Sequence, residues 1–313
     1  MKYQLGSSML SGKENIILHV QEKYIDVSTV LSDVHLREAL SLPEPMPSSL
    51  MHIMQHWPYW QTKLSTIVEF WLDYPEQIRQ QSQLRAEEIY WLPPLMYPNK
   101  LICLGANYND HNAEMDNTSL PKFPYCFLKP PTTTLVGSGQ IVLLPDYAKM
   151  IDWEVELAVV IGQKVRHVRG EAAMASIAGY SILNDISARD WVPKEEHSYF
   201  GLDWVMSKDF DGSAPMGPFV TPAEFVQDPQ ALALTLAVNG QVKQHSNTAN
   251  MVFSIQKIIE HLSTIMTLEP GDVIATGTPS GVGYGRKPRE FLRPGDIMVA
   301  EIEGLGRLET KMK

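Results

Sequence analysis

The stretch Ile151-Asp-Trp-Glu154-Val-Glu156-Leu-Ala-Val-Val-Ile161 sets two carboxylates at the start of a strongly apolar run. Residues two apart in a strand point to the same face, so Glu154 and Glu156 share one side of it. Two like charges on a half-buried surface are costly unless a cation lies between them, and Mg²⁺ prefers carboxylate oxygens. The stretch therefore predicts a strand that holds a divalent cation, while a solvent-facing pair at a strand end fits the local pattern equally well.

Similar short apolar runs surround this stretch and are separated by Gly, Pro and Asp. They cover 101–104, 140–144 and 232–238, and Asn239-Gly240 predicts a hairpin turn after the last of them. Pro-Gly-Asp at 270–272 and 294–296 predicts two further turns. Only two helices are expected here, over 171–179 and 254–268. Because strands and helices do not alternate over long distances, we expect an α+β, mostly β fold and not a doubly wound sheet.

The N-terminal third has a different pattern of apolar residues. Apolar stretches over 16–30 are compatible with a hairpin, and helical periodicity follows from Leu50 and again over 59–72. Pro93-Pro94 closes this segment. The sequence thus predicts a small α-rich N-terminal domain over 1–95 and a mostly β catalytic domain over 96–313.

Composition narrows the class of protein. The chain of 313 residues has 36 Asp and Glu against 26 Lys and Arg, a net charge of −10, which argues against a nucleic acid as partner. Two cysteines are too few for a disulfide framework. The longest apolar run near the start, Ile16-Ile17-Leu18, is too short for a signal peptide or a membrane span. We expect a cytoplasmic protein without membrane partners.

Other side chains could carry chemistry. Asp185 ends an apolar run and would complete a three-carboxylate site, or else cap a helix. His111 and Glu114 are three residues apart, so on a helix Glu114 could orient His111 as a general base for water. Lys208 lies in a loop-rich stretch, where a solvated surface lysine is the alternative. His52 and His56 have zinc-ligand spacing, but packing or surface placement explains them better.

The glycine-rich segment 275–285 lacks the spacing of a phosphate loop or a dinucleotide site. It is better interpreted as an active-site loop that presents backbone N–H groups. A Gly-x-Ser-x-Gly elbow does not occur in the sequence, which removes the main support for a serine hydrolase.

Seven ordered motifs give the sequence a family resemblance. They are Leu-Gly-x-Asn-Tyr-x-Asp-His-x-x-Glu (104–114), Phe-x-Lys-Pro-Pro-Thr (127–132), Asp-x-Glu-x-Glu-Leu-Ala-Val-Val-Ile-Gly (152–162), Gly-Tyr-x-x-x-Asn-Asp-x-Ser-Ala-Arg-Asp (179–190), Lys-x-Phe-Asp (208–211), Val-Asn-Gly (238–240) and Pro-Gly-Asp-Val-Ile-Ala-Thr-Gly-Thr-Pro-x-Gly-Val-Gly (270–283). Together they closely resemble the fumarylacetoacetate hydrolase family, in the branch near acylpyruvate hydrolases and 2-hydroxyhepta-2,4-diene-1,7-dioate isomerases. The resemblance covers about residues 100–313. It implies a mixed-β, sandwich- or roll-like core and a homodimer. It also implies a bound Mg²⁺, with Mn²⁺ or Ca²⁺ as alternative ions.

The resemblance also implies roles for individual residues. The metal carboxylates fall on Glu154, Glu156 and Asp185, and the active-site lysine on Lys208. The water-activating pair falls on His111 and Glu114, and the substrate contacts on Arg189 and Thr278. The sequence departs from the family at two positions, where Asn107 replaces a metal-ligating Asp of fumarylacetoacetases and Val192 replaces a common Gln.

These assignments lead to a function hypothesis. A small anionic 2-oxo or 2,4-dioxo acid would chelate the metal, and His111 with Glu114 would activate water for hydrolysis of a carbon–carbon bond in an acylpyruvate or fumarylpyruvate. An oxaloacetate decarboxylase or tautomerase, or a hydratase or isomerase of aromatic degradation, would use the same site without water attack. A catalytically silent binding protein is the third alternative.

Overall fold

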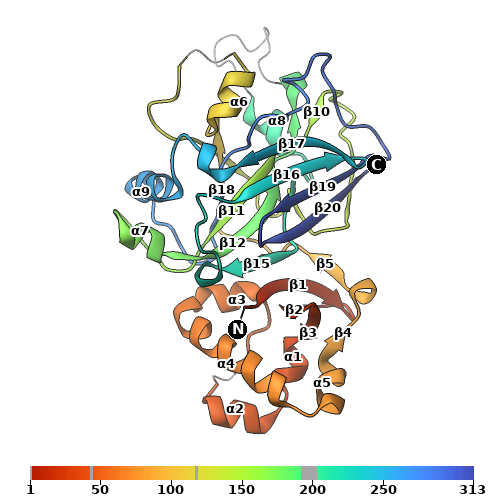
Figure 1. Cartoon of the computed structure of the whole chain (residues 1–313), viewed down its shortest axis with the longest axis vertical. Helices are drawn as coiled ribbons and strands as arrows, with labels where there is room; N and C mark the ends of the chain where they lie inside the picture. Colours follow the sequence, from red (N-terminus) through yellow and green to blue (C-terminus); the bar gives the residue numbers. More distant parts are fainter. Residues whose placement is uncertain (1, 43–44, 117–118, 192–202) are drawn as a thin grey trace.

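The computed structural model describes residues 2–42, 45–116, 119–191 and 203–313, and it has two parts that follow one another along the long axis (Figure 1). The N-terminal residues form a helix-covered sheet at one end. The remainder is rich in strands. The predicted α+β, mostly β class is confirmed.

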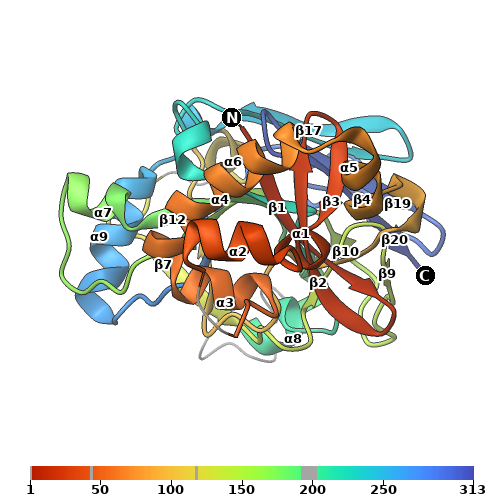
Figure 2. The same cartoon turned by 90° about the horizontal axis from the view of Figure 1, so that it is seen from below.

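The N-terminal part contains five strands and five helices among the residues described. The strands are β1 (Gln4–Leu10), β2 (Lys13–Val20), β3 (Lys23–Asp26), β4 (Gln83–Leu84) and β5 (Tyr90–Leu92), and the helices are α1 (Val27–Leu31), α2 (Val34–Leu40), α3 (Leu50–Gln55), α4 (Trp57–Asp73) and α5 (Glu76–Ser82). The predicted hairpin is confirmed for β2 and β3, but it ends early because the Asp26 side chain caps α1. In α4 the apolar stripe that includes Leu64 and Val68 is buried. Figure 2 shows α2, α3 and α4 lying across this end of the molecule.

A single eleven-stranded sheet runs through both parts. Its further strands are β6 (Leu101–Gly105), β7 (Tyr125–Lys129), β11 (Val155–Ile161), β12 (Ile177–Asn184), β15 (Phe219–Pro222) and β18 (Val273–Ala275). The order is β4-β3-β2-β1-β15-β12-β11-β18-β6-β7, with β5 paired to β1. Leu5 of β1 lies opposite Val220 of β15, so the sheet continues across the predicted boundary at residue 95. The division into two domains stays a prediction.

A five-stranded sheet packs against the centre of the large one. Its order is β17 (Gln241–Asn247), β16 (Ala233–Val238), β19 (Ile297–Ile302), β20 (Gly306–Met312) and β9 (Ile141–Val142). The predicted turn at Asn239-Gly240 is confirmed, since both residues have positive φ and join β16 to β17.

Strand β11 is buried over its whole length, which explains why all its residues except Glu156 are apolar. Leu157 and Val159 belong to the core shared with the five-stranded sheet. Ala158 and Val160 face the core shared with the N-terminal helices. The carboxylate of Glu156 thus lies in a strand with no solvent-exposed face.

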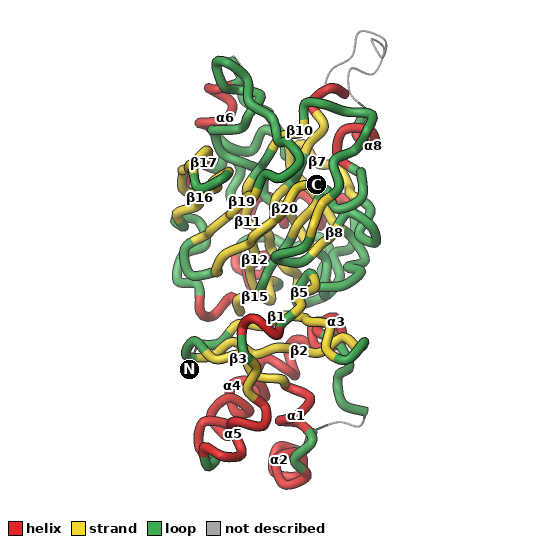
Figure 3. The backbone as a smooth tube through the Cα atoms, turned by 90° about the vertical axis from the view of Figure 1, so that its right-hand side faces the viewer, coloured by secondary structure: helices red, strands yellow, loops and turns green. Residues whose placement is uncertain are grey.

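The remaining elements are short. The helices are α6 (Asn109–Glu114), α7 (Glu171–Ala175), α8 (Trp204–Lys208) and α9 (Ile255–Ile265), the 3₁₀ turns are η1 (Ala86–Glu88), η2 (Arg189–Trp191), η4 (Ala223–Phe225) and η5 (Thr248–Asn250), and the strands are β8 (Leu135–Val136), β10 (Ile151–Asp152), β13 (Ser187–Ala188) and β14 (Ala214–Pro215). The prediction of a helix over 171–179 is wrong after Ala175, because Ile177 already pairs with β11. The helix predicted over 254–268 is confirmed as α9, with Ser254 as its N-cap. Figure 3 shows α6, α8 and β10 at the end opposite α2 and α5.

We expect Gly179→Ala to destabilise the protein by about 2–3 kcal/mol, because overpacking a filled core forces backbone shifts. A Cβ at Gly179 would lie 2.3 Å from the carbonyl oxygen of Thr221, where β12 meets β15. Urea unfolding followed by fluorescence measures the change. Gly105→Ala is the control, since its Cβ would meet only the Tyr125 ring, at 3.2 Å. Equal stability of Gly179→Ala and the parent would contradict this close packing.

Candidate functional site

Three carboxylates meet at one end of the β11–β12 pair. Glu154 directly precedes β11, Glu156 lies in it, and Asp185 directly follows β12. The two strands are antiparallel, with Val155 opposite Asn184, so these positions converge. One oxygen from each side chain lies within 4.8 Å of the others, and all three residues are buried. A solvent-facing pair is therefore ruled out, and Asp185 caps no helix, because β13 follows it.

The acidic cluster of Glu154, Glu156 and Asp185 fits a divalent cation. Glu156 Oε2 accepts a hydrogen bond from the Gly277 N–H at 2.7 Å, whereas Oε1 is buried without a partner. Burial, together with the neighbouring Asp185 and Glu154, raises the pKa of Glu156 well above its usual value. A buried carboxylate oxygen without a partner is costly, and a hard cation would satisfy it.

Two basic side chains bracket the same carboxylates. Lys208 Nζ lies 2.8 Å from Glu154 Oε2 and 2.6 Å from Asp185 Oδ2. Arg189 Nη2 lies 2.5 Å from Glu154 Oε1. Burial alone would raise the pKa of Glu154, but Lys208 and Arg189 outweigh it and lower that pKa to about 2. Lys208 is only 5% exposed, so the alternative of a solvated surface lysine is wrong.

Lys129 also belongs to this charge network, although its sequence motif predicts no role for it. Its Nζ lies 2.6 Å from Asp185 Oδ1 and 3.1 Å from the Ser213 carbonyl oxygen. It is 1% exposed, at the end of β7. The available signal was a lysine that ends a strand-like run; its pairing with Asp185, 56 positions away, could not be seen.

Asp152 is the second residue without a predicted role. Its carboxylate accepts hydrogen bonds from Arg189 Nε at 3.0 Å, Gly283 N at 2.6 Å and Tyr284 N at 3.0 Å. Asp152 is fully buried, and burial raises its pKa. It positions Arg189 and ties the glycine-rich loop to β10.

His111 and Glu114 both lie on α6, as predicted. His111 Nδ1 is 3.4 Å from Glu114 Oε2, which is long for a hydrogen bond. Glu114 Oε1 accepts a hydrogen bond from Gly281 N at 2.9 Å. Glu114 is thus held in place and faces the histidine, an arrangement that suits a general base.

The glycine-rich loop, residues 275–285, gives backbone N–H groups to the carboxylates of this site, as its sequence suggested. The backbone N–H of Gly277 donates to Glu156, that of Gly281 to Glu114, and that of Gly283 to Asp152.

Thr278 and Asn107 make hydrogen bonds within the protein. The Thr278 hydroxyl donates to the Val155 carbonyl at 2.9 Å and accepts from Gln244 Nε2 at 2.8 Å. The Asn107 amide donates to Thr276 O and accepts from Phe253 N, both at 2.8 Å. The Asn107 side chain therefore links the segment at Thr276 to the segment at Phe253.

A cavity of about 100 Å³, here the inner cavity, adjoins the acidic cluster. It is lined by Leu104, Gly105, Ala106, His111, Phe127, Glu154, Arg189, Trp204, Lys208 and Thr278. One wall is aromatic, with the Phe127 and Trp204 rings stacked at 4.1 Å between centroids, and the other is charged. All predicted catalytic and substrate-binding residues except Glu114 thus line one small space, and Glu114 contacts His111. Val192 lies outside the described residues.

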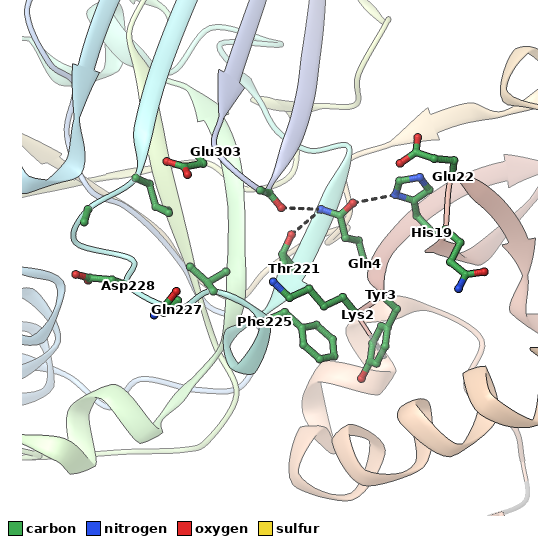
Figure 4. A pocket seen from close by; sticks show the side chains of 15 residues that line it. Lys2, Tyr3, Gln4, His19, Glu22, Thr221, Phe225, Gln227, Asp228 and Glu303 are labelled. Carbon is green, nitrogen blue, oxygen red and sulfur yellow. Dashed lines mark hydrogen bonds between the residues drawn. The ribbon is translucent and has the colours of Figure 1, made fainter.

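A larger cavity of about 600 Å³ lies between the N-terminal strands and the rest of the protein (Figure 4). The Gln4 amide crosses its floor, donating to Thr221 Oγ1 at 2.8 Å and lying 2.9 Å from His19 Nδ1. No group of three metal-ligating side chains lines it within the described part of the chain, where Glu154, Glu156 and Asp185 form such a group. The zinc alternative for His52 and His56 fails for the same reason, because in the described part of the chain no third metal-ligating side chain lies close to them. The volume of a cavity alone therefore does not identify the reactive site.

We expect Lys129→Met to lower the free energy of unfolding by about 3 kcal/mol, because it leaves a buried carboxylate oxygen of Asp185 without its cation. The matched control is Lys257→Met. Lys257 pairs with Glu260 but has a side chain 62% exposed, so a loss below about 1 kcal/mol is expected. Chemical denaturation of both variants at one pH gives the comparison. Similar losses in the two would show that burial of the Lys129–Asp185 pair does not matter.

Fold and site together define a mixed-β protein with a buried acidic cluster suited to a divalent cation and a small cavity beside it. The sequence profile of the fumarylacetoacetate (FAA) hydrolase C-terminal domain matches residues 100–313. The chain belongs to the fumarylacetoacetate hydrolase family, which confirms the resemblance seen in the motifs.

Relatives of known name include several tautomerases. The human protein named oxaloacetate tautomerase FAHD2B, mitochondrial, is 44% identical over 225 residues, 72% of this chain and 70% of the relative. Among solved structures, fumarylacetoacetate hydrolase from Exiguobacterium antarcticum matches with a TM-score of 0.77 and 29% identity over 99% of both chains. The 2-hydroxyhepta-2,4-diene-1,7-dioate isomerase from Mycobacterium marinum matches with a TM-score of 0.68 and 27% identity, covering 99% of this chain and 98% of its own.

These relatives support the predicted enzymatic activity, metal and substrate class, but not the predicted location or oligomeric state. Members of the family are enzymes, commonly dependent on a divalent metal, and small dioxo acids are consistent substrates. Within the described ranges, no helix is long and apolar enough to cross a membrane. The name of the human relative includes the word mitochondrial, so the cytoplasmic location of this protein stays a prediction, as does the homodimer.

Proposed function

We propose that this protein is a divalent-metal-dependent enzyme that interconverts the enol and keto forms of a small 2-oxo acid, with oxaloacetate as the substrate. The single observation that carries the proposal is the inner cavity beside the acidic cluster, which is lined by Lys208, Arg189 and His111. The 44% identity to a protein named oxaloacetate tautomerase supports the choice of substrate.

Glu154, Glu156 and Asp185 would hold Mg²⁺, which supplies Lewis acidity toward the carboxylate and 2-oxo oxygens of the substrate. Lys208 and Arg189 add positive charge beside the acidic cluster, where they stabilise negative charge on the 2-oxo oxygen. Their ion pairs with Glu154 keep the two cations oriented before substrate arrives.

His111 is the proton carrier in this proposal. With Nδ1 facing Glu114, Nε2 is the nitrogen left for the substrate. It takes the proton from the enol hydroxyl and returns one to C3, or the reverse, while Glu114 stabilises the charged imidazole. No water is consumed, and the apolar wall of Phe127 and Trp204 keeps water away.

Hydrolysis of a carbon–carbon bond in a 2,4-dioxo acid is the second candidate. The His111–Glu114 pair favours it, because the same base could deprotonate a water molecule that attacks the distal carbonyl. The bond between that carbonyl carbon and C3 then breaks, and C3 takes up a proton.

One set of assays separates the two reactions. Purified protein is given oxaloacetate, acetylpyruvate and fumarylpyruvate, each with Mg²⁺ and with EDTA. A tautomerase accelerates loss of the enol absorbance of oxaloacetate beyond the spontaneous rate, and EDTA abolishes the acceleration. A hydrolase instead releases pyruvate from the dioxo acids and incorporates one ¹⁸O atom from labelled water into the other acid product. Absence of both activities with Mg²⁺ present would support the silent binding protein and overturn the proposal.

A further inference from the structure

A cavity at the N-terminal end of the molecule is lined mainly by polar and basic side chains. This basic cavity, of about 330 Å³, has Lys23, Arg79 and Arg85 in its lining, and Glu76 is its one carboxylate among the residues described. Strands β3 and β4 and helix α5, which supply or adjoin these residues, lie at the end of the molecule opposite α6 and α8 (Figure 1). The basic cavity is therefore separate from the inner cavity, whose walls include residues of α6 and α8.

The sheet brings two of these cations together. Strands β3 and β4 are antiparallel, with Tyr24 opposite Leu84. Continuing this register by one residue brings Lys23 to the position opposite Arg85. Like charges directly opposite one another on a sheet repel and destabilise the pairing. An anion bound between the two side chains would replace this repulsion by attraction.

Arg79 brings a third positive charge from helix α5. Its guanidinium carbon lies 5.7 Å from the centre of the Trp71 ring, and Lys23 Nζ lies 6.0 Å from the same centre. Trp71 is 1% exposed, and its indole N–H donates to Ser82 Oγ at 2.8 Å, so the ring is fixed. Both cations are thus positioned by one buried ring.

Two of the three cations keep an uncompensated charge. Arg85 is paired with Glu88, at 2.6 Å. Lys23 and Arg79 are half-buried, and neither forms an ion pair with any residue that the structure describes. Arg79 Nε is buried without a hydrogen-bond partner there. The face of an aromatic ring attracts a cation but has no net charge, so in a chain of net charge −10 these cations indicate an anionic ligand.

Protection of a sheet edge explains only part of this arrangement. Strand β4 is at one end of the large sheet, and charged side chains on an edge strand hinder its pairing with another chain. That role would account for Arg85, which directly follows β4, but not for Arg79, which comes from a helix and lies near Trp71. Cations from a strand, a helix and a turn that line one cavity are better explained by an anion.

We propose that the basic cavity binds a phosphate group, with Lys23, Arg79 and Arg85 as its cations. A phosphate monoester carries about −1.5 to −2 charges at pH 7, which matches two unpaired cations, whereas a single carboxylate matches only one. A guanidinium group presents its N–H groups in a fork that fits two phosphate oxygens. The inference does not depend on the proposed function, because the basic cavity and the inner cavity share no residue.

Isothermal titration of the full-length protein tests the proposal with inorganic phosphate and with glycerol 3-phosphate. EDTA is present, so that no metal in the inner cavity holds the anion. The parent should bind at least one of the two with a dissociation constant of about 1 mM or lower. Binding should weaken as NaCl is added, because salt screens a partly exposed site. Equal binding of the two would identify the phosphate group alone as the ligand, and tighter binding of the ester would identify an organic phosphate.

The double variant Lys23→Gln, Arg79→Gln should bind phosphate at least about tenfold more weakly than the parent. The matched control Lys13→Gln, Arg307→Gln removes the same charge from exposed side chains outside the basic cavity and should bind like the parent. Arg85→Gln is a second variant for the case that the double variant does not fold. Its side chain is 71% exposed, so the substitution should preserve the fold, and a loss of about threefold is expected.

Three results would overturn the inference. The first is that the parent binds neither phosphate. The second is undiminished binding by the double variant or, where that variant does not fold, by Arg85→Gln. The third is an equal loss in the matched control, because the effect would then come from the overall charge of the protein and not from the basic cavity.

Discussion

Glu156→Gln is expected to abolish Mg²⁺ binding, with a loss of affinity of at least about a hundredfold, and to stabilise the metal-free protein. The loss of binding follows because the substitution removes the charge of a carboxylate whose Oε1 is buried without a partner in the acidic cluster. The gain in stability follows because a neutral amide is cheaper to bury than a carboxylate, while the hydrogen bond from Gly277 N can be kept.

The pH dependence of this stabilisation has a definite sign. The pKa of Glu156 in the folded protein is raised well above the ordinary value of 4.5. The unfolded chain therefore releases this proton more readily, and the parent loses stability as the pH rises above that value. The variant has no such group. Its advantage in thermal stability should grow as the pH rises above about 5, where the unfolded chain has lost this proton and the folded parent still holds it.

Calorimetric titration with Mg²⁺ and thermal unfolding in EDTA measure the two effects. Glu301→Gln is the control, since Glu301 has a side chain 55% exposed, and it should change neither. A Glu156→Gln protein that still binds Mg²⁺ like the parent would remove Glu156 from the metal site. One that is less stable than the parent in EDTA would mean that the buried carboxylate is compensated by a partner.

His111→Ala should reduce turnover by about a thousandfold, within the range that general acid–base catalysis contributes, and leave Mg²⁺ affinity close to that of the parent. His111 lines the inner cavity but is not one of the acidic cluster. The effect should fall on kcat, because the imidazole moves a proton and does not hold the substrate carboxylate.

The measurement is a steady-state assay with whichever acid the parent converts, together with the Mg²⁺ titration. His245→Ala is a suitable control, since His245 is an exposed residue of β17 and should keep full activity. Retained turnover in His111→Ala would exclude both proton-transfer schemes proposed above. Loss of Mg²⁺ binding in the same variant would mean that His111 holds the cluster and not the proton.

Much of the site followed from short-range pattern. Glu154 and Glu156 lie two apart at the start of one strand, and His111 and Glu114 lie three apart on one helix, so local geometry alone placed each pair. The helix predicted over 171–179 forms but ends at Ala175, so its C-terminal end was predicted wrongly, for the opposite reason. The alanines there favour a helix locally, but pairing with β11 decides that Ile177 begins a strand.

What the sequence determined by itself was the strand over 155–161, the turn at Asn239-Gly240 and the list of carboxylates and basic residues that could do chemistry. The tertiary structure decided how these charges are paired. Lys129 meets Asp185, Asp152 holds Arg189, and Glu156 is left with an unpartnered oxygen. The reason is physical: a strand or helix pattern depends on neighbours a few residues away, whereas the partner of a buried charge comes from wherever the chain returns, here over 37 and 56 positions.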